Sequence, residues 1–217
     1  MGSVMIRIVT MEREYGCGGG EIAQRLAERL GWKLWDQLLT EEIARLGSCT
    51  TEVVARREER TDPLHYRLFK SFLRGSYEGS LNAHKLKLID SESILKFTER
   101  VVQQAASTGN CVIVGRGSQL FLRSRRDTLR VFLYAPRENK VRRLLTRGKS
   151  EQEAEELVDT VDLERAAFID KYFKVEWPSR SVYHAMINTA IGDETVVKTI
   201  VDVMKALDSQ TTDRGAA

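Results

Sequence analysis

Residues 4–21 read VMIRIVTMEREYGCGGGE, an apolar stretch that runs into a glycine-rich loop. The apolar stretch predicts a strand over residues 5–10, and the loop leads into a helix that begins near Gly20 and stops at Gly31. A loop that opens a helix binds anions, because its unpaired N–H groups and the positive end of the helix dipole face the ligand. We therefore predict a phosphate loop over residues 16–21, formed by Gly16, Cys17, Gly18, Gly19, Gly20 and Glu21.

The phosphate loop lacks two side chains of the common phosphate-binding pattern G-x-x-x-x-G-K-[ST]. In that pattern the lysine balances charge on the outer phosphates and the hydroxyl group ligates magnesium. Here Gly18 is followed by Gly19, Gly20 and Glu21. The glycines preserve the shape of a phosphate loop, whereas the positive charge has to come from other parts of the chain.

Length and composition predict one α/β domain. A chain of 217 residues is long enough to bury a substantial core. The three cysteines lack metal-ligand spacing, and their odd number argues against a disulfide-stapled secreted fold. No apolar run approaches the roughly 20 residues that a transmembrane helix needs, and the first residues do not resemble a signal peptide. We therefore expect a cytoplasmic protein that does not bind membranes.

Charge is unevenly distributed along the chain, although the net charge of +3 is too small to predict a nucleic-acid partner. Residues 116–149 hold eleven lysines and arginines against two carboxylates. Residues 151–170 then hold eight carboxylates against the single Arg165. Two solvated helical faces would give this pattern, and so would a site that binds several phosphates.

Strands alternate with helices beyond the phosphate loop, which predicts a parallel sheet with right-handed crossovers. The further strands are expected at residues 33–35, 110–114, 129–134 and 184–189, and the later helices at 137–147, 151–173 and 194–207. Ligands of open parallel sheets bind at the carboxyl ends of the strands. Polar or glycine residues at the ends of these strands include Glu12, Arg13, Asp36, Gly115, Arg116 and Asn188.

Four patches of the sequence resemble the cytidylate kinase-like family, a divergent branch of the P-loop nucleoside monophosphate kinases. They are REYGCGG at 13–19, GWKLWD at 31–36, VIVGR at 112–116 and DLERA at 162–166. The resemblance implies a three-layer P-loop kinase fold of the α/β class with a five-stranded parallel sheet. It divides the single domain into a core (1–39, 92–146 and 174–207), a helical monophosphate-binding insertion (40–91), a mobile lid (147–173) and a flexible tail (208–217).

The resemblance also implies roles for individual residues. Asp36, Gly115 and Arg116 match the acceptor site, although Arg116 and Asp36 would also make a purely structural pair. Arg143 or its neighbour Arg142 matches an arginine of the donor site. Arg165 matches a lid arginine, although Asp162 three residues earlier would make an ordinary helical ion pair with it.

Physical chemistry adds a fourth arginine and a metal ligand to these roles. A guanidinium is always protonated and binds two phosphate oxygens at once, so Arg13, Arg143 and Arg165 are the expected catalytic residues. Magnesium requires oxygen ligands, and Glu12 is the expected one, with Glu21 and Asp36 as alternatives.

Two functions of different classes remain open on the sequence, and kinase activity on a different acceptor is a third possibility, because residues 40–91 show no readable specificity motif. The first is ATP-dependent and Mg²⁺-dependent phosphoryl transfer to a small phosphorylated acceptor, which the resemblance specifies as CMP or dCMP. The second is a nucleotide-binding or sensing protein that kept the fold and lost turnover together with the loop lysine. Either way the expected partners are small nucleotides, and any homo-oligomer is expected to form through the helical insertion.

Overall fold

The computed structural model describes residues 5–36, 38–39, 41–43, 45–46 and 91–213. The predicted helical insertion at 40–91, and with it the predicted oligomer surface, lies almost wholly outside these residues. None of the helices in this described part is both long and apolar enough to cross a membrane.

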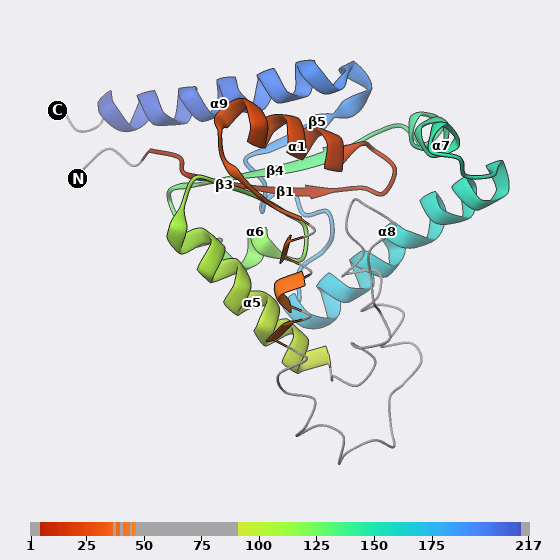
Figure 1. Ribbon diagram of the computed structural model, residues 1–217, viewed down its shortest axis with the longest axis horizontal. Coiled ribbons are helices and arrows are strands. Elements are labelled where there is room, and N and C mark those ends of the chain that lie inside the picture. Colours follow the sequence, from red (N-terminus) through yellow and green to blue (C-terminus); the bar gives the residue numbers. More distant parts are fainter. Residues whose placement is uncertain (1–4, 37, 40, 44, 47–90, 214–217) are drawn as a thin grey trace, which may run out of the picture.

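The core is a five-stranded parallel sheet in the order β2-β3-β1-β4-β5 (Figure 1). The strands are β1 (Ile8–Arg13), β2 (Lys33–Trp35), β3 (Cys111–Val114), β4 (Thr128–Tyr134) and β5 (Ala185–Asn188). Strand β1 lies in the centre, with Ile8 paired to Cys111 of β3 on one side and to Thr128 of β4 on the other. Its carboxyl end is therefore surrounded by the ends of its neighbours, which is where ligands of such sheets bind.

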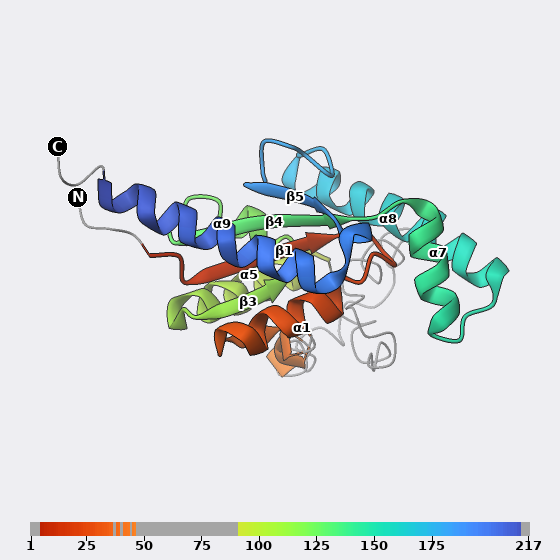
Figure 2. The same ribbon diagram turned by 90° about the horizontal axis from the view of Figure 1, so that it is seen from above.

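Helices cover both faces of the sheet, as Figures 1 and 2 show from two directions. The helices are α1 (Gly19–Leu30), α5 (Ser91–Thr108), α6 (Ser118–Phe121), α7 (Arg137–Thr146), α8 (Glu151–Phe173) and α9 (Asp193–Asp213), with a 3-10 turn at Thr189–Ile191. Apolar residues of α1 and α9, such as Ile22 and Val196, pack with Val9 on one face. Residues of α5 and α8, such as Val102 and Phe168, pack with Ile8 on the other. The predicted three-layer α/β fold is confirmed.

The first strand begins and ends three residues later than predicted. All six residues of Ile8–Arg13 are buried, because β1 is central and both of its faces are covered. Polar Glu12 and Arg13, expected just beyond the end of the strand, instead pair with Phe132 and Leu133 as the last two positions of the strand. The pattern of apolar residues could not predict this, because a buried strand is recognised by its apolar run. Polar side chains that are buried with hydrogen-bond partners interrupt that run.

Helix α8 spans the predicted residues, and its second half belongs to the core. Phe168 and Ile169 lie in the same apolar cluster as Ile8 of the central strand. The division of 147–173 as a lid therefore stays a prediction. Helix α9 continues to Asp213, past the predicted end at Leu207, and Asp208 accepts a hydrogen bond of 2.7 Å from the Ile6 amide.

Candidate phosphate site

The phosphate loop joins the end of β1 to the start of α1 and requires glycine at two positions. Gly16 and Gly18 have φ angles of 78° and 86°, in the left-handed region that favours glycine. Gly18 is the N-cap of α1 and brings no side-chain acceptor to the first helical turn. Helix N-termini carry backbone donors that need an outside partner, so this turn suits an anion.

A pocket, here called the loop pocket, opens against the phosphate loop. It is lined by Arg13, Glu14, Tyr15, Gly16, Gly18, Gly19, Gly20, Arg147 and Arg165. The structure thus brings predicted residues Arg13 and Arg165 to the loop from different elements, namely β1 and α8. It adds Arg147, which follows α7 and which the sequence analysis did not select from the eleven basic residues of its block.

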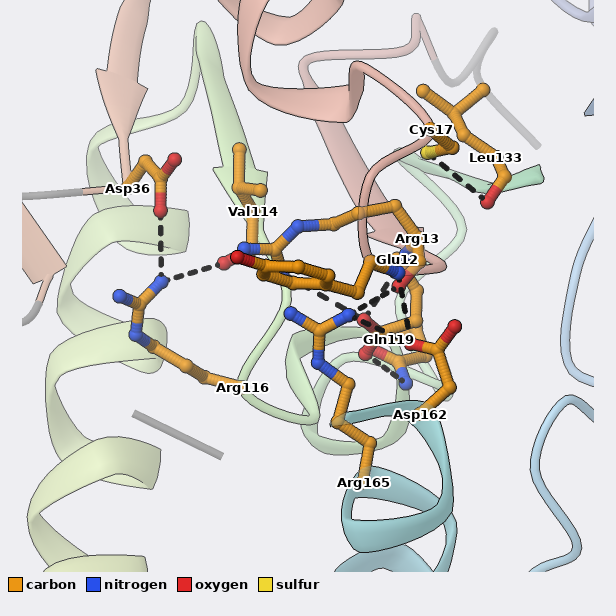
Figure 3. Close-up of polar contacts among 11 residues, drawn as sticks. Glu12, Arg13, Cys17, Asp36, Val114, Arg116, Gln119, Leu133, Asp162 and Arg165 are labelled. Atoms are coloured by element: carbon orange, nitrogen blue, oxygen red, sulfur yellow. Dashed lines mark hydrogen bonds and ion pairs between the residues drawn. The ribbon is translucent and has the colours of Figure 1, made fainter. Parts of the chain in front are cut away.

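Arg13 is buried at the centre of this arrangement (Figure 3). Its Nη1 lies 3.8 Å from the Glu12 carboxylate. Burial, assisted by the neighbouring charge of Arg165, lowers the pKa of Arg13 to about 10. The side chain therefore remains a cation at neutral pH, and the neighbouring carboxylates of Asp36 and Glu12 favour that charge.

Asp162 of α8 ties the phosphate loop to the arginines. It accepts a hydrogen bond of 2.8 Å from the Tyr15 amide and one of 3.1 Å from Nη1 of Arg165. Arg165 in turn donates to the backbone oxygen of Arg13 at 3.0 Å. The ion pair that the sequence left as an alternative role for Arg165 is therefore present, and it holds Arg165 at the loop pocket.

Lys140 of α7 forms ion pairs with two carboxylates next to the phosphate loop. Its Nζ lies 3.0 Å from Glu14 and 3.6 Å from Asp162. Burial raises the pKa of Asp162 to about 6, although Arg165 and Lys140 oppose that effect. Asp162 and Lys140 could not be selected as site residues from the sequence, because nothing in a run of charged residues shows which side chains turn inward.

The predicted acceptor residues come together beside the loop pocket. Nη1 of Arg116 lies 3.0 Å from Asp36 and also donates to the Val114 oxygen at 3.0 Å, and both side chains are buried. Gly115, Arg116 and Gly117 have φ angles of 66°, 56° and 68°, so the chain turns sharply where β3 ends. This turn places Arg116 on the side of Arg13 that is away from the phosphate loop (Figure 3).

Glu12 is engaged by the protein on both carboxylate oxygens. One accepts from the Arg13 amide at 3.1 Å and the other from Gln119 at 3.3 Å. The described residues include no group of three or more histidine, cysteine, aspartate or glutamate side chains placed to hold a metal. Magnesium is commonly held by one or two carboxylates together with substrate phosphates. The metal role of Glu12 stays a prediction.

Arg143 lies apart from the other predicted catalytic arginines. It packs across Gly18 and makes a two-point ion pair with Asp193 of α9, with distances of 3.1 and 2.7 Å. It borders a second hollow, here called the outer pocket, on the far side of Gly16. The outer pocket is lined by Gly16, Ala135, Asn139, Arg142, Arg143, Thr146, Thr189 and Ala190.

Two residues of the phosphate loop have side chains with clear partners. Glu21 turns to Arg147 and forms an ion pair with it. Cys17 is buried with its Sγ 3.7 Å from the Leu133 oxygen, and burial raises the pKa of this thiol to about 12. Cys17 is therefore a small packing residue rather than a reactive thiolate.

A parallel sheet whose central strand leads through a glycine loop into a helix, with arginines gathered over that loop, defines the P-loop kinase fold. The chain belongs to the cytidylate kinase-like family, whose model matches residues 8–191. A comparison with curated proteins finds no match.

Solved structures share this fold at low sequence identity. An uncharacterised protein from Eubacterium ventriosum is 20% identical, with a TM-score of 0.66 over 93% of this chain and 99% of that chain. A shikimate kinase from Bacteroides thetaiotaomicron is 14% identical, with a TM-score of 0.51 over 91% of this chain and 98% of that chain. At such identities the likeness carries the fold and not the substrate.

Proposed function

We propose that this protein transfers a phosphoryl group from ATP to a small acceptor that already carries a phosphate, with CMP or dCMP as the expected acceptor. The observation that carries the proposal is the convergence of Arg13, Arg147 and Arg165 on the loop pocket. Three cations from β1, α8 and the segment after α7 that line one glycine loop suit a multiply charged anion.

The proposed reaction needs charge and alignment more than covalent help from the protein. An acceptor phosphate oxygen forms a bond to the γ-phosphorus while the bond to the β,γ-bridging oxygen breaks, and ADP leaves with that electron pair. The attacking oxygen of a monophosphate is already ionised at neutral pH, so no general base is required. Arg13 and Arg165 would stabilise the charge on the transferring oxygens.

The neighbouring elements suit the two ends of such a reaction. The outer pocket adjoins the phosphate loop through Gly16 and combines aliphatic and guanidinium surface, which suits the nucleoside part of the donor. Arg116, on the opposite side of Arg13, suits the phosphate of the acceptor. Magnesium would neutralise charge on the donor phosphates when bound, and Glu12 at the end of β1 is the carboxylate that we propose as its ligand.

A screen of nucleotides tests the proposal directly. Thermal shift with ATP, GTP, CMP, dCMP and other monophosphates should identify ligands, and phosphate transfer should then be followed with ATP, Mg²⁺ and each acceptor. We expect ATP to stabilise the protein and at least one monophosphate to be phosphorylated. Binding of ATP without transfer to any acceptor would favour the second candidate, a nucleotide sensor.

Arg116→Ala is expected to lower kcat/KM for the acceptor by about 10- to 100-fold while ATP affinity stays unchanged. The variant also leaves Asp36 buried without its ion pair, at a cost of about 3–5 kcal/mol in unfolding free energy. Arg116→Ala combined with Asp36→Asn should recover stability without recovering activity, and exposed Arg126→Ala is the matched control. Loss of ATP affinity in the Arg116 variants would contradict an acceptor role.

Glu21 is relevant to the second candidate, a nucleotide sensor. Its carboxylate forms an ion pair with Arg147 beside the loop pocket, where the phosphates would bind. Glu21→Gln removes a negative charge next to the phosphates and releases Arg147. We expect the variant to bind ATP about 3-fold more tightly by titration calorimetry, since an ion pair whose side chains are 32% and 38% exposed contributes little. Glu28→Gln, exposed on the same helix, is the control. Weaker binding by Glu21→Gln would instead indicate that Glu21 holds a ligand or metal.

A further inference from the structure

Gly19 occupies the place of the lysine in the common phosphate-binding pattern, yet its backbone does not require glycine. It is the first residue of α1 and is absent from the positions with positive φ. The restriction comes from space, because a Cβ at Gly19 would lie 2.8 Å from Cγ and 3.0 Å from Cβ of Arg13. The volume into which a side chain at position 19 would grow is therefore filled by the stem of Arg13.

Gly115 likewise leaves space for the other end of the Arg13 side chain. A Cβ at Gly115 would overlap Nη1 of Arg13 and would lie 3.3 Å from its Cζ. The arginine thus crosses Gly19 with its methylene groups and places its guanidinium over Gly115. This position lies between the phosphate loop and the turn that carries Arg116, so the guanidinium stands between the proposed donor and acceptor sides.

We propose that Arg13 supplies to the outer donor phosphates the positive charge that a lysine at position 19 supplies in other loops, and that Gly19 and Gly115 are the gaps that admit it. The inference rests on the proposed function for the identity of its ligand, a nucleoside triphosphate. The cation that contacts the outer phosphates then comes from the central strand β1 and not from the phosphate loop. Arg13 and a side chain at position 19 then exclude each other sterically.

An exchange of the two positions tests this inference. Binding of inorganic tripolyphosphate and of ATP is measured by titration calorimetry for the wild-type chain, Arg13→Ala, Gly19→Lys and the double variant. We expect Arg13→Ala to weaken both ligands by about 10- to 100-fold, because a charged bidentate contact is lost. Gly19→Lys alone should also bind poorly, since two side chains compete for one volume, and the double variant should regain most of the lost affinity.

Controls separate this inference from the proposed function. Arg25→Ala removes the same charge from the exposed face of α1 and should change nothing. If Arg13→Ala does not fold, Gly19→Ala pushes on the Arg13 stem without changing charge and is expected to weaken tripolyphosphate binding. A wild-type protein that binds neither ligand overturns the proposed function. The role proposed here for Arg13 is overturned by itself if the wild type binds and Arg13→Ala or Gly19→Ala binds equally well. It is also overturned if the double variant does not regain affinity.

Discussion

Replacement of Arg165 by alanine is expected to reduce kcat by about 1000-fold or more, the loss typical of an arginine that stabilises a transferring phosphoryl group. ATP affinity should fall much less, because the phosphate loop and Arg13 remain. The structural basis is that Arg165 is fixed by two contacts, to Asp162 and to the Arg13 backbone oxygen, at the edge of the loop pocket. A guanidinium held in advance needs little reorganisation when charge develops.

Arg137 provides a matched control on the same pair of helices. It also contacts carboxylates of α8, Glu155 and Asp159, but its side chain is about half exposed and faces solvent. Arg137→Ala should leave kcat unchanged in the coupled ADP-release assay used for Arg165→Ala. If Arg165→Ala retains its rate within about 10-fold, Arg165 is an ordinary helical ion pair and does not act on the transferring phosphate.

Asp162→Asn is expected to lower kcat by about 100- to 1000-fold, because the carboxylate positions Arg165 and the Tyr15 amide together. Asparagine keeps the size and can still accept from Tyr15, so the fold should persist. A purely structural role would not change the pH profile. A positioning role predicts that wild-type kcat falls as pH drops through about 6, where Asp162 takes up a proton and loses its ion pairs.

Asp162 also sets the direction in which the unfolding free energy changes with pH. Burial raises the pKa of Asp162 from 3.8 to about 6, so the folded protein favours the protonated form. Stability from this group is therefore fully present below pH 3.8 and is lost as pH rises through about 6. The unfolding free energy of wild type minus that of Asp162→Asn should decrease from pH 4 to pH 7 by at most about 3 kcal/mol. A difference that increases over this range would contradict the assignment.

In this candidate phosphate site, the backbone N–H groups and the positive charges come from different parts of the chain. The phosphate loop contributes shape and N–H groups, with Gly16 and Gly18 in the left-handed conformation that its turn requires. The cations come from β1, α8 and the segment after α7. Such a division would let a loop without lysine still face a polyphosphate, with Asp162 holding Arg165 and the Tyr15 amide in place.

The strand, glycine loop and helix over residues 4–31 could be predicted because they depend on local backbone preference and apolar periodicity. The same holds for α8, whose bounds agree with the prediction. Prediction failed where burial overrode pattern, as at Glu12 and Arg13, which belong to β1. Nor could the sequence show that Arg143 pairs with Asp193, because helix periodicity gives no information about contacts with a distant helix.

The sequence by itself determined the fold class, the phosphate loop and the set of arginines from which a site could be built. Only the tertiary structure decided which of them meet: Arg13 and Arg165 at the loop pocket, Arg116 with Asp36, and Arg143 with Asp193. The physical reason is that these contacts join residues far apart in the chain, such as the Tyr15 amide and Asp162, 147 positions apart. Local preferences act over a few residues, whereas packing of the sheet and its helices sets which charges are buried together.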